Sequence, residues 1–233
     1  MRLQQLDPHT MITGMWVKQQ WQRVRGQPVA VQLVWAVLLA EVCLALWERQ
    51  WPLAAVATIT IGLTVLPLYL SSRIGIRLPT AFLVGIILFI FATIWLGEAF
   101  DFYNRYWWWD VVMHGGSGLG FGMLGFLFAF TLFEGDRFAA PAWALALIAF
   151  SFAVTIGALW EVFEFAMDQL FGFNMQKSGL LDTMGDLIVD VTGAGIGALA
   201  GWAYLRGRGP GFTRRAFEEF VQRNRRFFRK FRR

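Results

Sequence analysis

Three aspartates, Asp182, Asp186 and Asp190, recur at intervals of four near the end of the chain. Residues four apart share one face of a helix, so their carboxylates form a stripe about 12 Å long. The surrounding sequence is apolar, where such acids are costly and usually functional. Carboxylate oxygens suit Mg²⁺, Mn²⁺ or Ca²⁺, and one ion cannot contact the whole stripe. The stripe predicts either two cations or one cation and a proton-carrying acid.

Two further groups carry the same chemistry. Asp110 and His114 lie four residues apart, and Glu161 and Glu164 lie three apart, so each pair shares a helix face. Six ionised carboxylates cannot crowd together at low dielectric: some must be protonated, neutralised by Arg105 or Lys177, or bound to a cation. The predicted site has these parts: metal ligands Glu161, Glu164, Asp182 and Asp186; a deeper ligand or proton carrier, Asp190; a general acid or base, His114, oriented by Asp110; and phosphate-binding Arg105 and Lys177.

Simpler interpretations exist for some of these residues. Asp110 and Asp182 fit the first turn or the N-cap of a helix, where the dipole favours acids. Thr183 with Asp186 resembles a capping box, and a lone histidine is often a satisfied core residue. These interpretations do not reach Asp190, which lies two turns into its helix. They also fail for Glu161 and Glu164, near a helix C-terminus where the dipole opposes negative charge.

The elements that position these residues are predicted to be membrane helices. Of the 233 residues 57% are hydrophobic and 16% charged, which indicates an all-α integral membrane protein with a bundle of about six spans. Cys43 is the single cysteine, which excludes an intramolecular disulfide. The predicted spans are 29–47, 52–70, 80–100, 110–133, 139–167 and 183–205. A basic segment, 1–28, precedes them without the features of a cleaved signal, and a basic tail, 206–233, follows.

Charge sorting predicts the orientation. Six spans put both termini on one side, and that side carries 18 of the 21 Lys and Arg residues, so both termini are predicted to be cytoplasmic. The acidic groups then converge at the outer leaflet. In the tail, five apolar residues fall on one helical face: Phe217, Phe220, Val221, Phe228 and Phe231. We expect this basic amphipathic tail to lie on the anionic inner leaflet rather than to bind nucleic acid.

A glycine-rich run follows His114 and ends at Gly122. No strand precedes it, so it is not a nucleotide-binding loop. Its pairs, Gly116 with Gly120 and Gly118 with Gly122, have the spacing of close helix packing, as do Gly193, Gly197 and Gly201 in the last span. We therefore expect the fourth and sixth spans to pack closely, bringing His114 toward Asp186 and Asp190.

Three of these patterns, in this order, resemble the VanZ-like superfamily, and most closely its YjdF-type branch of bacterial inner-membrane proteins. They are Asp110-x-x-x-His114 before a glycine-rich helix, Glu161-x-x-Glu164 at the end of the next, and the Asp182/Asp186/Asp190 stripe before Gly193. The resemblance covers about residues 98–201. It implies a small polytopic helical protein of the bacterial cell envelope, and it transfers no catalytic residue.

Three functions fit the sequence. The leading hypothesis is a metal-dependent enzyme that hydrolyses or transfers a phosphoester of a lipid head group at the outer leaflet. The second is a transporter in which the acids carry protons or cations, although the polar residues stop in the outer half of the spans. The third is a non-catalytic envelope protein with a structural polar cluster, whose tail recruits a partner.

Overall fold

The computed structural model describes residues 26–133, 140–209 and 211–228, and every regular element in these ranges is helical. Six helices are long and apolar enough to cross a membrane. They are α2 (Val29–Trp47), α3 (Trp51–Ile74), α4 with the wider π-helical turns of η1 (Thr80–Ile90 and Phe91–Ala99), α6 (Trp107–Leu132), α7 (Ala142–Phe171) and α8 (Leu180–Leu205). The prediction of an all-α protein with six membrane helices is confirmed, and the protein is a multi-pass membrane protein. Its orientation in the membrane stays a prediction.

The helix bounds follow from local chemistry. Prolines 28, 79 and 141 stand immediately before α2, α4 and α7, where the missing N–H and the fixed φ suit a helix start. The α7 helix ends at Gly172, whose φ of 70° is a left-handed value that favours glycine, and its N–H donates to the Asp168 carbonyl. Helix α6 starts at Trp107 rather than at Asp110, and α7 runs past the predicted end at 167. Between η1 and α6 lies the single turn α5 (Phe102–Arg105).

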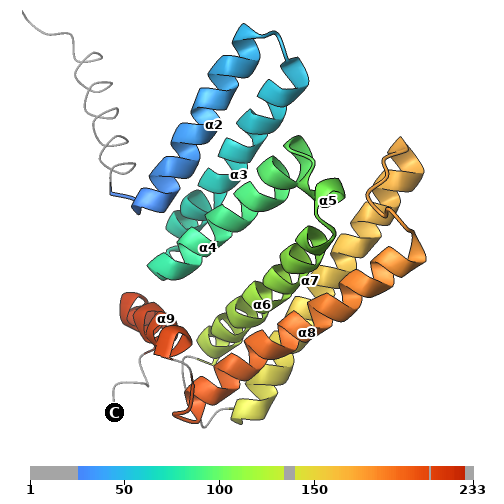
Figure 1. Cartoon of the computed structure of the whole chain (residues 1–233). Coiled ribbons are helices and arrows are strands. Elements are labelled where there is room, and N and C mark those ends of the chain that lie inside the picture. The colour runs from blue at the N-terminus through green and yellow to red at the C-terminus, as the bar shows by residue number, and fades with distance from the viewer. Residues whose placement is uncertain (1–25, 134–139, 210, 229–233) are drawn as a thin grey trace, which may run out of the picture. The chain divides into compact units, whose positions relative to one another are not determined.

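The chain forms two units, residues 1–62 and 63–233. The first contains α2 and the beginning of α3, joined through Arg49, which has a left-handed backbone. In the second, α6, α7 and α8 pack side by side (Figure 1). The site residues and the C-terminal helix α9 (Gly211–Arg223) all belong to this second unit. Of the predicted segment 1–28, residues 1–25 lie outside the described residues, as does the predicted turn at 134–138.

Helices α6 and α8 meet backbone to backbone along a glycine seam formed by Gly118, Gly122, Gly193 and Gly197. A Cβ atom on Gly193 would lie 2.5 Å from the Gly115 carbonyl oxygen, and one on Gly197 would lie 2.5 Å from that of Leu119. The expected packing of these two spans is therefore observed. Gly116 and Gly120 take no part in it, since a Cβ on either would have no neighbour within 4 Å.

The C-terminal helix packs on the protein through its apolar face. Phe217, Phe220, Val221 and Phe228 are buried, and the Phe217 ring lies 5.2 Å from that of Phe126 on α6. The expectation that this face lies on the inner leaflet is wrong for these four residues, because protein covers them; Phe231 lies outside the described residues. Contact of the tail's exposed arginines with anionic lipid stays a proposal.

Asn224 fixes the end of α9 to the segment between α3 and α4. Its side-chain oxygen accepts a hydrogen bond from the Arg77 N–H at 2.7 Å, and its amide nitrogen donates to the Arg77 carbonyl at 2.8 Å. Arg223 adds a hydrogen bond to the Leu78 carbonyl at 3.0 Å. The Asn224 side chain is 2% exposed, so its two bonds to Arg77 are partly shielded from water, whereas the Arg223 bond is exposed.

Replacing Gly197 with Ala is expected to lower the free energy of unfolding by about 1–3 kcal/mol, because the added methyl forces α6 and α8 apart. The matched control is Gly120→Ala, which adds the same atom where nothing lies within 4 Å. That control is expected to be neutral or slightly stabilising, because glycine weakens a helix interior. Thermal unfolding followed by tryptophan fluorescence compares them, and equal midpoints would contradict the seam.

Replacing Asn224 with Ala is expected to free α9, because the two hydrogen bonds between the buried Asn224 side chain and the Arg77 backbone are lost, at a cost of about 0.5–1.5 kcal/mol each. Trypsin cleavage after Arg214 and Arg215 should then speed up by roughly fivefold or more. Gln222→Ala, at an exposed position on the same helix, is the control. Identical cleavage rates in both variants would show that α9 is held in some other way.

Candidate metal centre

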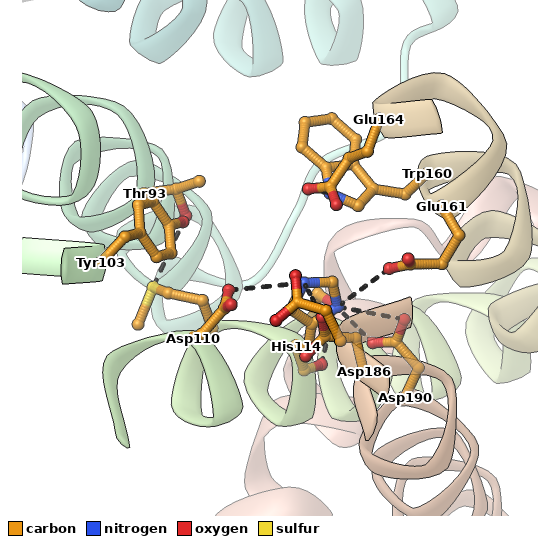
Figure 2. A network of polar contacts seen from close by, with 12 residues as sticks. Thr93, Tyr103, Asp110, His114, Trp160, Glu161, Glu164, Asp186 and Asp190 are labelled. Atoms are coloured by element: carbon orange, nitrogen blue, oxygen red, sulfur yellow. Dashed lines mark hydrogen bonds and ion pairs between the residues drawn. The ribbon is translucent and has the colours of Figure 1, made fainter. Parts of the chain in front are cut away.

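His114 lies at the centre of five polar side chains from three helices (Figure 2). The glycine seam sets this position, since the close approach of α6 and α8 brings the His114 ring against the aspartate stripe. The members come from α6 (Asp110 and His114), α7 (Glu161) and α8 (Asp186 and Asp190). We call these five residues the polar cluster. Side-chain exposure within it runs from 20% for Asp110 down to 3% for Asp190.

Each ring nitrogen of His114 faces two carboxylates. On one side, Nε2 lies 3.7 Å from an Asp110 oxygen and 3.9 Å from an Asp186 oxygen. On the other side, Nδ1 lies 3.3 Å from an Asp190 oxygen and 3.9 Å from a Glu161 oxygen. The ring therefore sits between two acidic pairs, and either nitrogen can carry the proton that faces its own pair.

Glu161 has the least satisfied carboxylate of the cluster. Its side chain is 5% exposed, and neither of its oxygens has a hydrogen-bond partner at normal distance in the described part of the chain. A buried polar group without a partner costs about 1–3 kcal/mol, and a charged one more. Glu161 points toward His114 from α7 (Figure 2), so its unused oxygens face the centre of the cluster.

Two sets of possible ligand atoms share His114. The first is Asp110, His114 and Asp186; the second is His114, Glu161 and Asp190. Within each set the three atoms lie within 4.8 Å of one another, a spacing that a single cation can bridge. Two carboxylate oxygens with one imidazole, as each set offers, suit a cation such as Mg²⁺ or Mn²⁺. Of the predicted stripe, Asp186 thus belongs to the first set and Asp190 to the second, whereas Asp182 belongs to neither.

Lys177 approaches the cluster from the loop between α7 and α8. Its ammonium lies 3.4 Å from an Asp110 oxygen, donates to the Tyr103 carbonyl at 3.1 Å and stands over the Tyr103 ring at 4.9 Å. Burial raises the pKa of the Tyr103 hydroxyl well above its usual range, and the Asp110 carboxylate adds to this, so the phenol stays protonated. Lys177 is the cation nearest to the cluster in the described residues.

Two carboxylates organise that loop. The side chain of Asp168 accepts hydrogen bonds from the Met175 N–H at 2.7 Å and the Gln176 N–H at 2.9 Å. Asp182 accepts one from the Lys177 N–H at 3.1 Å. Asp182 lies in the first turn of α8 and therefore holds the loop that carries Lys177.

Three predicted site residues lie apart from the polar cluster. Glu164 accepts a hydrogen bond from the Trp160 indole at 2.8 Å, and Asp182 is engaged by the loop. Arg105 is exposed and lies 4.0 Å from Asp101 on its own short turn. Neither Glu164 nor Asp182 belongs to a possible ligand set among the described residues. The chemical roles of all nine predicted residues stay predictions.

Sequence reasoning missed three residues that shape the cluster. Ser117 donates to an Asp190 oxygen at 3.2 Å; its signal was a hydroxyl three residues after His114. Gly157 leaves room for Asp190, whose Oδ2 would lie 2.5 Å from a Cβ added to the glycine. The sequence feature that could have indicated this is a small residue one turn before Glu161. The third is Asp168, described above, whose capping of a loop carried no sequence signal.

Comparison with known proteins places the chain in a family of membrane proteins. An uncharacterised protein of Thermotoga maritima is 35% identical over 99 residues, 42% of this chain and 50% of that protein. The match thus spans about half the length of that relative. No solved structure matches. The family described as "Predicted membrane protein (DUF2238)" matches residues 30–207, so the chain belongs to this family of membrane proteins.

Proposed function

We propose that this protein is a metal-dependent enzyme that hydrolyses or transfers a phosphoester of a membrane lipid head group. The observation that carries the proposal is the buried polar cluster, in which four carboxylates surround the His114 ring. Lys177 contacts this cluster from the loop through Asp110. The resemblance to VanZ-like proteins of the bacterial envelope is itself part of this proposal.

Charge balance supports a divalent cation. Four ionised carboxylates face at most two positive charges, Lys177 and a protonated His114, which leaves two negative charges without compensation. Buried charge without a partner is strongly unfavourable, so either protons or a cation must supply the difference. A divalent ion bound by a neutral His114 nitrogen would, together with Lys177, offset three of the four negative charges and leave one carboxyl group to hold a proton. The ion would also give the Glu161 oxygens, which lack a hydrogen bond, a role.

The chemistry follows from the donors. A bound cation would polarise a phosphoryl oxygen and lower the pKa of a coordinated water. The His114 nitrogen that faces the other acidic pair would then move a proton. Lys177, 30% exposed and 3.4 Å from Asp110, would pair with the phosphate. Of the two residues predicted to bind phosphate, Lys177 contacts the cluster whereas Arg105 pairs with Asp101, so we assign the role to Lys177.

Transport is less well supported. A route for protons or cations needs polar or hydrated walls beyond the cluster. The cavity that continues from the cluster between α4 and α6 has no ionisable residue in its lining and one hydroxyl, that of Ser117. A purely structural cluster remains the alternative that a failure to bind metal would favour.

The proposal is tested by the divalent-metal affinity of the protein in lipid nanodiscs, measured with Mn²⁺ and Mg²⁺. Asp186→Asn and Glu161→Gln are each expected to weaken binding by at least about tenfold, since each removes an oxygen from a ligand set. Asp182→Asn and Glu164→Gln are matched controls with the same chemical changes outside both sets, and they should stay near wild type. Equal losses in all four variants, or no binding, would refute the metal centre.

Charge crowding is tested without metal. With a chelator present, His114→Ala is expected to lower the free energy of unfolding by about 1–3 kcal/mol, because four carboxylates then face each other without the ring. Adding Glu161→Gln to that variant should restore part of the loss, a coupling of about 0.5–3 kcal/mol. Adding Glu48→Gln, at an exposed position in the other unit, should restore nothing. Additive effects of His114→Ala and Glu161→Gln would contradict the crowding.

A further inference from the structure

A large apolar cavity adjoins the polar cluster. It has a volume of about 690 Å³ and runs between α4–η1 and α6, with α9 at its far end. A smaller cavity of about 340 Å³ is lined by His114 and Asp190 together with apolar residues of α7. Ser117 and Met113 line both cavities, so the two spaces share a wall beside the cluster.

Glycines keep the large cavity open. Gly116 and Gly120 on α6 and Gly85 on α4 line it, and a Cβ on any of them would meet nothing within 4 Å. Each glycine in a helix interior costs about 0.5–1 kcal/mol relative to alanine. At Gly118 and Gly122 this cost is offset by close packing against α8. Gly85, Gly116 and Gly120 have no helix packed against them. Their effect is to leave an open apolar channel along α6, whose lining includes the exposed Val112, Leu119 and Phe212.

The cavity fits an amphiphile. Its lining on α6 extends from Val112 to Leu124, about 18 Å along the helix, close to the ~15 Å of hydrocarbon in one bilayer leaflet. Its volume lies within the roughly 300–1,000 Å³ of ligand sites. Its one polar lining residue is Ser117, which donates a hydrogen bond to Asp190 of the polar cluster at 3.2 Å, whereas the rest of the lining is apolar.

We propose that this cavity holds a hydrocarbon chain of a lipid phosphate whose head group lies at the polar cluster. This inference rests on the proposed function and names its substrate class: a lipid phosphate bound with one chain in this open channel. The head group meets Lys177 and the cluster, and the chain runs along Gly116 and Gly120 toward Phe212 of α9. Apolar walls give the chain no directional contacts, so selection acts on its length and width.

The test uses dodecyl phosphate with a diazirine at the end of its chain, added to the full-length protein in nanodiscs and photolysed. Adducts are expected on the distal lining, at Leu124 and Phe212, and unlabelled dodecyl phosphate should compete better than dodecanol. Gly120→Leu should abolish these adducts, because the new side chain fills the channel where nothing blocks it. The control Gly62→Leu, at another glycine with open space, should leave them unchanged.

Adducts spread evenly over lipid-facing residues and unchanged by Gly120→Leu would overturn the inference, as would equal competition by dodecanol. A change of oligomeric state in Gly120→Leu with no distal adducts in wild type would assign the cavity to a second copy of the chain. If Gly120→Leu does not fold, Gly85→Leu closes the same channel from α4. Metal affinity is measured in the same samples: binding without distal adducts refutes only the chain site, and adducts without binding refute only the metal centre.

Discussion

Backbone contact between α6 and α8 is the constraint on which the rest of the site depends. With Gly118 and Gly122 against Gly193 and Gly197, the two helices approach more closely than any side chain would allow. That approach places the His114 ring within 3.3 Å of the second-turn aspartate, Asp190. A wider spacing would leave the imidazole and the carboxylates as separate polar groups in an apolar bundle, each without compensation.

The seam explains why α7 also needs a glycine. Asp190 lies on α8 at its contact with α6, and its carboxylate extends to α7. It fits there because Gly157 has no side chain. Glu161 then enters one turn later from the same helix. The cluster is therefore formed by three helices that small residues bring close together, and Asp190 occupies the space beside Gly157. Rigid helices hold the donors, while the loop carrying Lys177 is held by Asp168 and Asp182.

Much of the architecture could be predicted because helix periodicity is local. The bounds of α2 match the prediction, since Pro28 and the polar residues from Glu48 frame one apolar run. The convergence of His114 with Asp186 and Asp190 followed from spacing and glycine packing. Spacing alone could not tell the two glycine pairs of α6 apart: Gly118 and Gly122 face α8, whereas Gly116 and Gly120 line a cavity.

Other features depend on tertiary partners that spacing does not reveal. Glu164 shares a helix with Glu161 but accepts a hydrogen bond from Trp160, a choice of rotamer that periodicity leaves open. Asp182 belongs to the predicted stripe, yet the loop fold engages it. The amphipathic tail has an apolar face that would suit a membrane surface. Its contact with Phe126 and the hydrogen bond between Asn224 and Arg77 show instead that protein covers this face. Periodicity identifies a face, and tertiary packing decides what covers it.

The most direct test of the central claim, that His114 and its acids hold a cation, is pulsed electron paramagnetic resonance of the Mn²⁺-loaded protein with ¹⁵N-labelled histidine. The chain has two histidines, His9 and His114, so the source of a nitrogen signal can be assigned by substitution. The account predicts a ¹⁵N coupling from one imidazole that persists in His9→Ala and disappears in His114→Ala. A Mn²⁺ spectrum without nitrogen coupling in the wild type, or a coupling that survives the loss of His114, would contradict it.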